Sequence, residues 1–130
     1  MTNQKYRTRF SILLFLLFIT VFNTSSADVH EIQSSDDYFD FMGRELVVFT
    51  FSAPWCGPCR QFSPQLSGLA TKYSGQVDFA TVDIENVPTV ATNIAELPTI
   101  LVFKNGSRVA GFVGADIQRL HAAIRKQLEE

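Results

Sequence analysis

LVVFTFSAPWCGPC, residues 46–59, joins an apolar run to the only two cysteines of this 130-residue chain. The run at 46–51 is rich in β-branched and aromatic residues, which is typical of a strand buried on both faces. We expect a helix to begin at Cys56, because Gly57 permits a tight turn and Pro58 is tolerated in a first helical turn. The segment therefore predicts a strand that passes directly into a helix carrying both cysteines.

The spacing of Cys56 and Cys59 permits a short, reversible disulfide. A helix start surrounds Cys56 with unpaired N–H groups and the positive end of the helix dipole, and both favour a thiolate. The thiolate is the attacking species in thiol–disulfide exchange. We therefore expect Cys56 to be the exposed nucleophile and Cys59 to be the buried resolving thiol.

Other roles for the cysteine pair have weaker support. A structural disulfide that closes so short a loop would remove little entropy from the unfolded chain. A structural zinc site needs four ligands, and His30 and His121 lie far from the pair in the sequence. Inert buried thiols are common but are not usually paired as CxxC after an apolar strand. The pattern favours redox activity, and we expect neither a metal nor another cofactor.

The first 27 residues have the layout of a secretory signal peptide. Lys5, Arg7 and Arg9 precede a thirteen-residue apolar run at 10–22, and small residues lead up to Ala27. The run is shorter than the ~20 residues of a membrane-spanning helix. We expect cleavage after Ala27, with an uncleaved signal anchor as the alternative. Residues 28–130 would then be one domain, secreted or held in the lumen of the secretory pathway or in the periplasm.

Removal of residues 1–27 would leave an acidic domain. That segment holds three of the eleven Lys and Arg residues and none of the thirteen Asp and Glu residues, so the remainder has a formal net charge of −5. An acidic domain without a basic patch argues against nucleic acid as a partner. We also expect a monomer without stable membrane contact once the signal is cleaved. Export implies an oxidising compartment, in which disulfides persist.

Strand and helix signals alternate along residues 28–130. Strands are expected at 29–32, 46–51, 77–84, 99–103 and 108–113, with a hairpin turn at Asn105-Gly106. Helices are expected after the cap candidates at 34–37, from Cys56 to about Tyr73, at 87–93, and from Gly114 onward. The last helix would place Ile117, Leu120, Ile124 and Leu128 on one apolar face. The alternation predicts an α/β fold with a central mixed sheet flanked by helices, and a reactive site at the carboxyl ends of its parallel strands.

With its elements in this order, the chain resembles the thioredoxin family over residues 29–128. WCGPC at 55–59 has the Gly-Pro dipeptide of thioredoxins rather than the Gly-His of protein disulfide isomerases. Further segments match the family at the expected positions: Ala53-Pro54, Pro64, Leu97-Pro98-Thr99, FKNG at 103–106, Gly111 and Gly114. Several spaced motifs in register are more specific than CxxC alone, and they imply a thioredoxin fold.

The resemblance also implies roles for residues around the cysteines. Trp55 would flank a substrate pocket, with Gly57 and Pro58 supporting the active site. Pro98 would follow a cis peptide bond and would belong, with Leu97, to the substrate-binding loop, where Leu97 would offer main-chain groups to an incoming peptide. The partners would be proteins with disulfides or thiols, together with a protein that donates or accepts electrons.

Two positions depart from the family pattern. Thr50 stands where family members usually carry a buried aspartate, which is thought to help the second cysteine lose its proton. Thr81 stands where a lysine is common. We expect the Thr50 hydroxyl to bond to the main chain, as strand threonines can, and the site to lack this proton acceptor.

The sequence thus predicts an exported thiol–disulfide oxidoreductase. Cys56 would attack a substrate disulfide and Cys59 would resolve the mixed disulfide. The Gly-Pro dipeptide favours a reductant whereas export favours oxidation or isomerisation, so the direction of electron flow stays open. The alternative is a redox-independent peptide-binding or chaperone-like module that uses the groove at Pro98.

Overall fold

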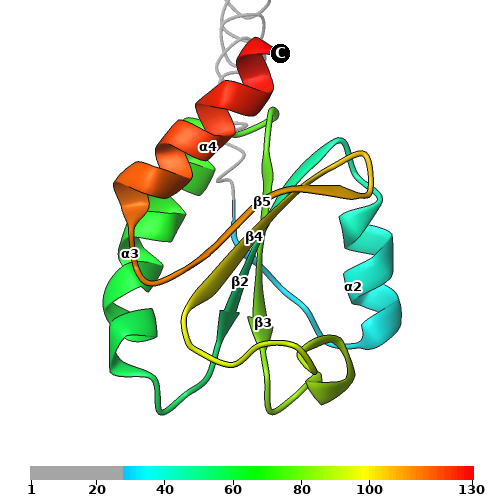
Figure 1. Cartoon of the computed structure of the whole chain (residues 1–130), viewed down its shortest axis with the longest axis vertical. Helices are drawn as coiled ribbons and strands as arrows, with labels where there is room; N and C mark the ends of the chain where they lie inside the picture. The colour runs from blue at the N-terminus through cyan, green and yellow to red at the C-terminus, as the bar shows by residue number, and fades with distance from the viewer. Residues whose placement is uncertain (1–27) are drawn as a thin grey trace, which may run out of the picture.

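Residues 28–130 form a sheet with helices on both faces in the computed structural model, which describes this part of the chain (Figure 1). The predicted signal peptide at 1–27 lies outside the described residues. The elements follow in the order β1 (His30–Glu31), α2 (Ser35–Met42), β2 (Leu46–Ser52), α3 (Gly57–Lys72), β3 (Asp78–Asp83), β4 (Thr99–Lys104), β5 (Ser107–Val113) and α4 (Ile117–Glu129), with a short 3₁₀ helix between β3 and β4.

The sheet has five strands in the order β1-β3-β2-β4-β5. β3 runs parallel to both β1 and β2, whereas β4 is antiparallel to β2 and β5 is antiparallel to β4. The turn between β4 and β5 uses Asn105 and Gly106 at positive φ, 50° and 80°. The predicted mixed sheet and its hairpin are therefore confirmed.

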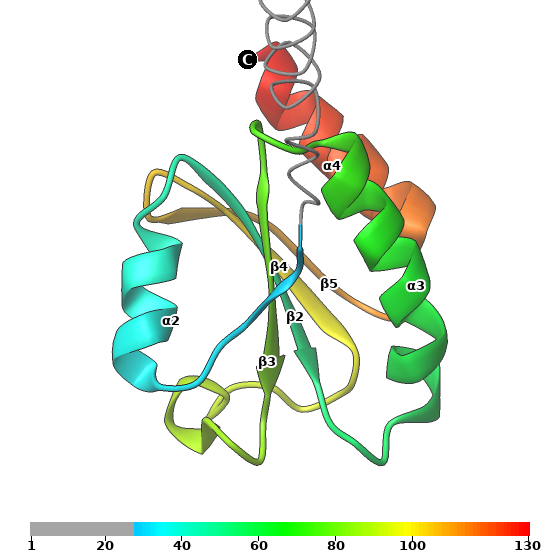
Figure 2. The ribbon, with the colours of Figure 1, turned by 180° about the vertical axis from the view of Figure 1, so that it is seen from behind.

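α3 and α4 cover one face of the sheet and α2 covers the other, as the two opposite views show (Figures 1 and 2). Side chains alternate along β2 between these faces: Val48 packs in the cluster under α3 and α4, whereas Val47 and Phe49 pack in the cluster under α2. Both faces are apolar, which explains why the sequence of β2 is almost continuously hydrophobic.

The predicted helix at 87–93 is wrong in extent, because only Pro88–Val90 is helical and it is a 3₁₀ turn. Threonine and valine, which fill most of this segment, are poor helix formers, and 3₁₀ geometry suits short pieces. No helix within residues 28–130 is both long and apolar enough to cross a membrane.

The predicted apolar face of α4 is partly wrong. Leu120 and Ile124 are fully buried, but Leu128 is 40% exposed and Gln127 is only 8% exposed. Each residue turns the helix by about 100°, so position 128 lies about 40° beyond position 124, at the edge of the stripe that 120, 124 and 127 define. The helix also begins later than Gly114: its N-cap is Asp116, whose carboxylate accepts a hydrogen bond from the Arg119 N–H at 2.9 Å.

Candidate active site

Cys56 caps the N-terminus of α3, directly beyond the carboxyl end of β2. Its sulfur accepts a hydrogen bond from the Cys59 N–H at 3.2 Å, and its own N–H donates to the Ala53 carbonyl at 3.1 Å. Pro58 lies in the first helical turn, where its missing N–H leaves nothing unpaired. The predicted passage from strand to cysteine-bearing helix is confirmed.

Cys56 and Cys59 form a disulfide with their Cα atoms 5.3 Å apart. Each cysteine is 5% exposed, so the expected greater exposure of Cys56 is not seen in this oxidised state. The bond holds both residues in one small cluster with Ala53, which Ile84 and Leu97 border. What distinguishes the two cysteines is the hollow that each lines.

Cys56 lines an open groove of about 460 Å³, here called the Cys56 groove. Trp55 forms part of its wall and is 64% exposed, with its indole N–H donating to a Glu85 carboxylate oxygen at 2.9 Å. The wall consists of Trp55, Cys56, Gly57, Pro58, Ile84, Ile94, Ala95, Glu96 and Leu97. Glu85 was not predicted, because an acidic residue shortly after a strand gives no local sign of a partner thirty positions away.

The loop before β4 contributes Leu97 to the Cys56 groove. The Leu97–Pro98 peptide bond is cis, as the resemblance implied. Pro98 itself is fully buried and is not among the residues that line the groove. Within residues 28–130 the main-chain N–H and C=O of Leu97 have no hydrogen-bond partner, whereas the Pro98 carbonyl accepts from Gly114 at 2.8 Å.

Cys59 lines a second hollow, on the face of the sheet that α3 covers, with a volume of about 270 Å³. We call it the Cys59 cavity. Thr50 and Thr81 lie directly opposite each other on the parallel strands β2 and β3, and both line it. The Cys59 cavity is thus the place where the two departures from the family pattern meet.

The Thr50 hydroxyl is buried without a hydrogen-bond partner in the described part of the chain. Thr50 is 4% exposed, so the expected bond to the main chain is wrong. β2 is a central strand, and its main-chain groups are taken up by the ladders to β3 and β4 on either side. The hydroxyl is left facing the Cys59 cavity.

Two carboxylates, from Glu31 and Asp83, also line the Cys59 cavity. Sequence reasoning missed both. For Glu31, the pairing of β1 with β3 is the feature that would have indicated its place. Residues opposite each other on neighbouring strands share a face of the sheet, and Glu31 lies opposite Thr81. That register could not be deduced from a strand as short as β1.

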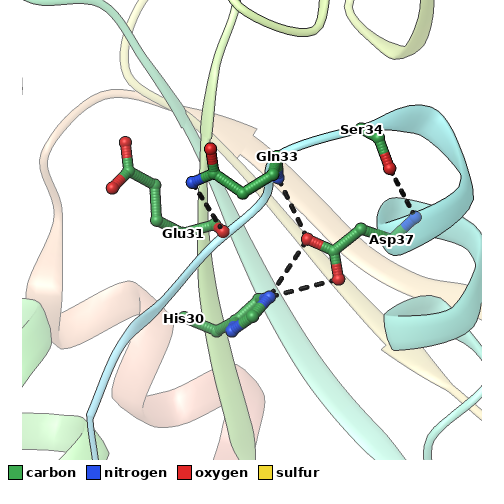
Figure 3. Close-up of polar contacts among 5 residues, drawn as sticks. All are labelled: His30, Glu31, Gln33, Ser34 and Asp37. Atoms are coloured by element: carbon green, nitrogen blue, oxygen red, sulfur yellow. Dashed lines mark hydrogen bonds and ion pairs between the residues drawn. The ribbon is translucent and has the colours of Figure 1, made fainter.

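The two histidines lie in other contacts. His30 bonds to the Asp37 carboxylate at 3.1 Å, and the Gln33 N–H donates to the same carboxylate at 3.0 Å (Figure 3). The Gln33 N–H and then His30 lower the pKa of Asp37. His121 packs against the Tyr73 ring. Among residues 28–130 no group of three His, Cys, Asp or Glu side chains could hold a metal ion.

Known proteins similar to this chain are thioredoxins. A family model described as thioredoxin matches residues 29–127. The thioredoxin of Callithrix jacchus is 39% identical over 103 residues, which cover 75% of this chain and 97% of that protein. The chloroplastic M-type thioredoxin of Spinacia oleracea is 37% identical over 97 residues, 70% of this chain and 54% of that protein.

Solved structures agree with this similarity. The thioredoxin of Malassezia sympodialis superposes with a TM-score of 0.73 at 33% identity, over 78% of this chain and 91% of that one. The thioredoxin of Trypanosoma brucei brucei has a TM-score of 0.78 at 24% identity and supports the fold alone. With a CxxC disulfide at the helix start that this fold provides, the chain belongs to the thioredoxin family of thiol–disulfide oxidoreductases.

Proposed function

We propose that this protein is an exported thiol–disulfide oxidoreductase in which Cys56 attacks the substrate and Cys59 resolves the mixed disulfide. The observation that carries the order of attack is the position of each cysteine. Cys56 is the N-cap of α3 and lines the Cys56 groove, whereas Cys59 lies one turn further into α3 and lines the separate Cys59 cavity. The free N–H groups and the dipole at the helix start stabilise a thiolate at Cys56 more strongly than a thiolate at Cys59, which lies one turn further into the helix.

The Cys56 groove fits an extended peptide that carries the target disulfide. Trp55 and Leu97 line the groove together with Cys56 and supply apolar contact there. The unpaired main-chain groups of Leu97 can pair with a substrate main chain in the way that an added strand pairs with a sheet edge. Such contacts are independent of substrate side chains, so they suit a protein that acts on several protein disulfides.

Export is supported by the sequence of residues 1–27. A basic start, a short apolar run and small residues before position 28 make up the signals that an exporting peptidase reads. In this proposal the mature domain is a monomer in an extracellular, luminal or periplasmic compartment. It exchanges electrons there with a second redox protein and binds neither nucleic acid nor membrane.

Trapping of mixed disulfides tests the order of attack. Cys59→Ser leaves Cys56 able to attack but removes the resolving thiol, so it should accumulate covalent adducts with substrate proteins. Cys56→Ser is the matched control and should trap none, because Cys59 does not border the groove. The adducts are counted on non-reducing gels and should disappear on reduction.

Alkylation provides an independent reading of the same assignment. Iodoacetamide at mildly acidic pH should label Cys56 before Cys59 in the reduced wild type, because only a thiolate reacts appreciably. Earlier labelling of Cys59, or adducts on Cys56→Ser in the amount seen with Cys59→Ser, would show that the roles are reversed.

A further inference from the structure

The Cys59 cavity has the properties of a hydrated site. Its volume of about 270 Å³ exceeds the ~30 Å³ that one water occupies in the liquid. Thr50 presents a buried hydroxyl that no described residue satisfies, and such a group is costly unless it finds a partner. The cavity is polar enough to supply a water with further partners, since Thr81 and Ser52 also line it.

The polar side chains of this cavity form a row across three strands. Thr50 of β2 lies opposite Thr81 of β3, and Thr81 lies opposite Glu31 of β1. Neighbouring strands are about 4.8 Å apart, and residues opposite each other share one face of the sheet. The row therefore begins under Cys59 and ends at Glu31, an exposed residue on the edge strand.

The Glu31 carboxylate is free to serve this cavity. Its main-chain oxygen accepts a bond from Gln33, but no hydrogen bond or ion pair engages its carboxylate within residues 28–130. Figure 3 shows that carboxylate pointing away from the His30–Asp37 pair. Asp83 also lines the cavity, but one of its carboxylate oxygens already accepts the Glu85 N–H at 2.9 Å.

Other charged groups surround Glu31 and set the electrostatics of the site. Arg60 of α3 lines the Cys59 cavity and donates to the Pro54 carbonyl at 2.7 Å. Glu31 also lines a third hollow, together with Asp28, His30, Arg44 and Asp78. Within residues 28–130 the Arg44 guanidinium pairs with Asp78 at 3.1 Å, so neither Arg60 nor Arg44 is committed to Glu31.

We propose that Glu31 is the proton acceptor for Cys59, acting through water held by the Thr50 and Thr81 hydroxyls. This inference rests on the thiol–disulfide exchange proposed above and replaces the missing buried aspartate with a carboxylate from β1. Glu31 does not touch the reacting sulfurs. It acts on Cys59 only through the water, as a positioning residue that accepts the proton.

Resolution of the mixed disulfide begins with loss of the Cys59 proton. The Cys59 thiol gives its proton to water and the water gives one to Glu31, which leaves a Cys59 thiolate. That thiolate forms a bond to the Cys56 sulfur, and the bond between Cys56 and the substrate sulfur breaks. The substrate leaves as a thiolate that takes a proton from solvent, and Glu31 returns its proton to solvent. The dithiol is oxidised and the substrate disulfide is reduced.

Reaction of the reduced protein with dithiobis(nitrobenzoate) separates the two chemical steps. The first coloured thiolate is released when Cys56 attacks, and the second when Cys59 resolves the mixed disulfide. Glu31→Gln should slow the second phase about tenfold and leave the first unchanged. This is less than the ~10²–10⁴-fold typical of general acid–base catalysis, because solvent can take the proton in place of Glu31. Glu45→Gln is the matched control and should change neither phase. It removes an exposed glutamate that directly precedes β2, at the end of the strand away from the cysteines.

Chemical rescue distinguishes proton transfer from a structural role. Formate is small enough to enter the cavity and should restore most of the second phase in Glu31→Gln without affecting Glu45→Gln. Thr50→Val should also slow the second phase, whereas Thr50→Ser, which keeps the hydroxyl, should not. A Glu31→Gln variant with a wild-type second phase, or one that formate does not rescue, would overturn the proton route alone. A wild type without any second phase would overturn the resolving role of Cys59 as well.

Discussion

Thr50 lines the cavity of the resolving cysteine and carries an uncharged hydroxyl there. A buried carboxylate there would oppose a second negative charge on the thiols. We therefore expect its absence to favour the thiolate of Cys56 and so a more oxidising disulfide, because a stable thiolate favours the reduced form. This single residue therefore bears on both the potential of the pair and the route of the Cys59 proton.

Thr50→Asp tests that coupling. The added negative charge should raise the pKa of the Cys56 thiol, make the disulfide more reducing and speed resolution. Thr50→Asn is the matched control, because it has the same shape without the charge and should leave the thiol titration near that of the wild type. Thiolate absorbance against pH measures the titration. Equal titration curves for the Asp and Asn variants would show that position 50 is not coupled to the thiols.

The same substitution should lower stability. Thr50 is 4% exposed, and its strand neighbour Thr81 offers no positive charge. An unpaired buried carboxylate typically costs several kcal/mol or takes up a proton instead. The loss in free energy of unfolding should therefore be larger for Asp than for Asn at neutral pH and should shrink in acid, where the carboxylate is neutral.

Some features of single residues could be predicted from the sequence and others could not. Cys56, Cys59, Trp55 and the cis bond before Pro98 were all predicted, because local spacing and motif register determine them. The unpaired hydroxyl of Thr50 was not, because it depends on which main-chain groups the neighbouring strands have already used.

At the scale of elements, two apolar residues one turn apart on α4 should contribute very differently to stability. Ile124 is fully buried in the core under α3 and α4, whereas Leu128 is 40% exposed. Ile124→Ala should lower the free energy of unfolding by about 3 kcal/mol through lost burial and a cavity. Leu128→Ala, the control on the same helix, should change it by less than about 0.5 kcal/mol. Denaturant unfolding measures both, and equal losses would mean that the apolar face includes Leu128 as the sequence pattern suggested.

The contact between β1 and α2 should respond to acid. The Gln33 N–H and His30 lower the pKa of Asp37, so the charged carboxylate stabilises the fold. For a lowered pKa, that stabilisation is complete above the unfolded value of about 3.9 and is lost as the pH falls through the lower folded value. The stability difference between wild type and Asp37→Asn should therefore shrink below about pH 4. Denaturant unfolding from pH 6 down to pH 3 measures it, and a difference that stays constant would contradict the assignment.

Elements with strong patterns were predicted and those that depend on tertiary pairing were not. The apolar run of β2, the hairpin at Asn105-Gly106 and the cysteine helix each carry their own local signal. The 3₁₀ turn at Pro88–Val90 and the register of β1 against β3 do not. The candidate site follows the same division, since its Cys56 side was predicted and the carboxylates of the Cys59 cavity were not.

At the scale of the whole molecule, export depends on processing of residues 1–27. We expect cleavage between Ala27 and Asp28, which removes the basic start and leaves a domain of net charge −5. Intact mass and N-terminal sequencing of the exported protein check this. A full-length species that stays with the membrane fraction would favour an uncleaved signal anchor, and substitution of an arginine for Leu14 in the apolar run should abolish export in either case.

Redox activity of the Cys56–Cys59 pair is most directly tested by reduction of insulin disulfides with dithiothreitol as the source of electrons. The mature wild-type protein should accelerate precipitation of the released insulin chains well beyond the rate with dithiothreitol alone. A double variant, Cys56→Ser with Cys59→Ser, should keep the fold and the groove but react no faster than dithiothreitol. Equal acceleration by the wild type and the double variant would contradict the account and favour a binding module that does not use its cysteines.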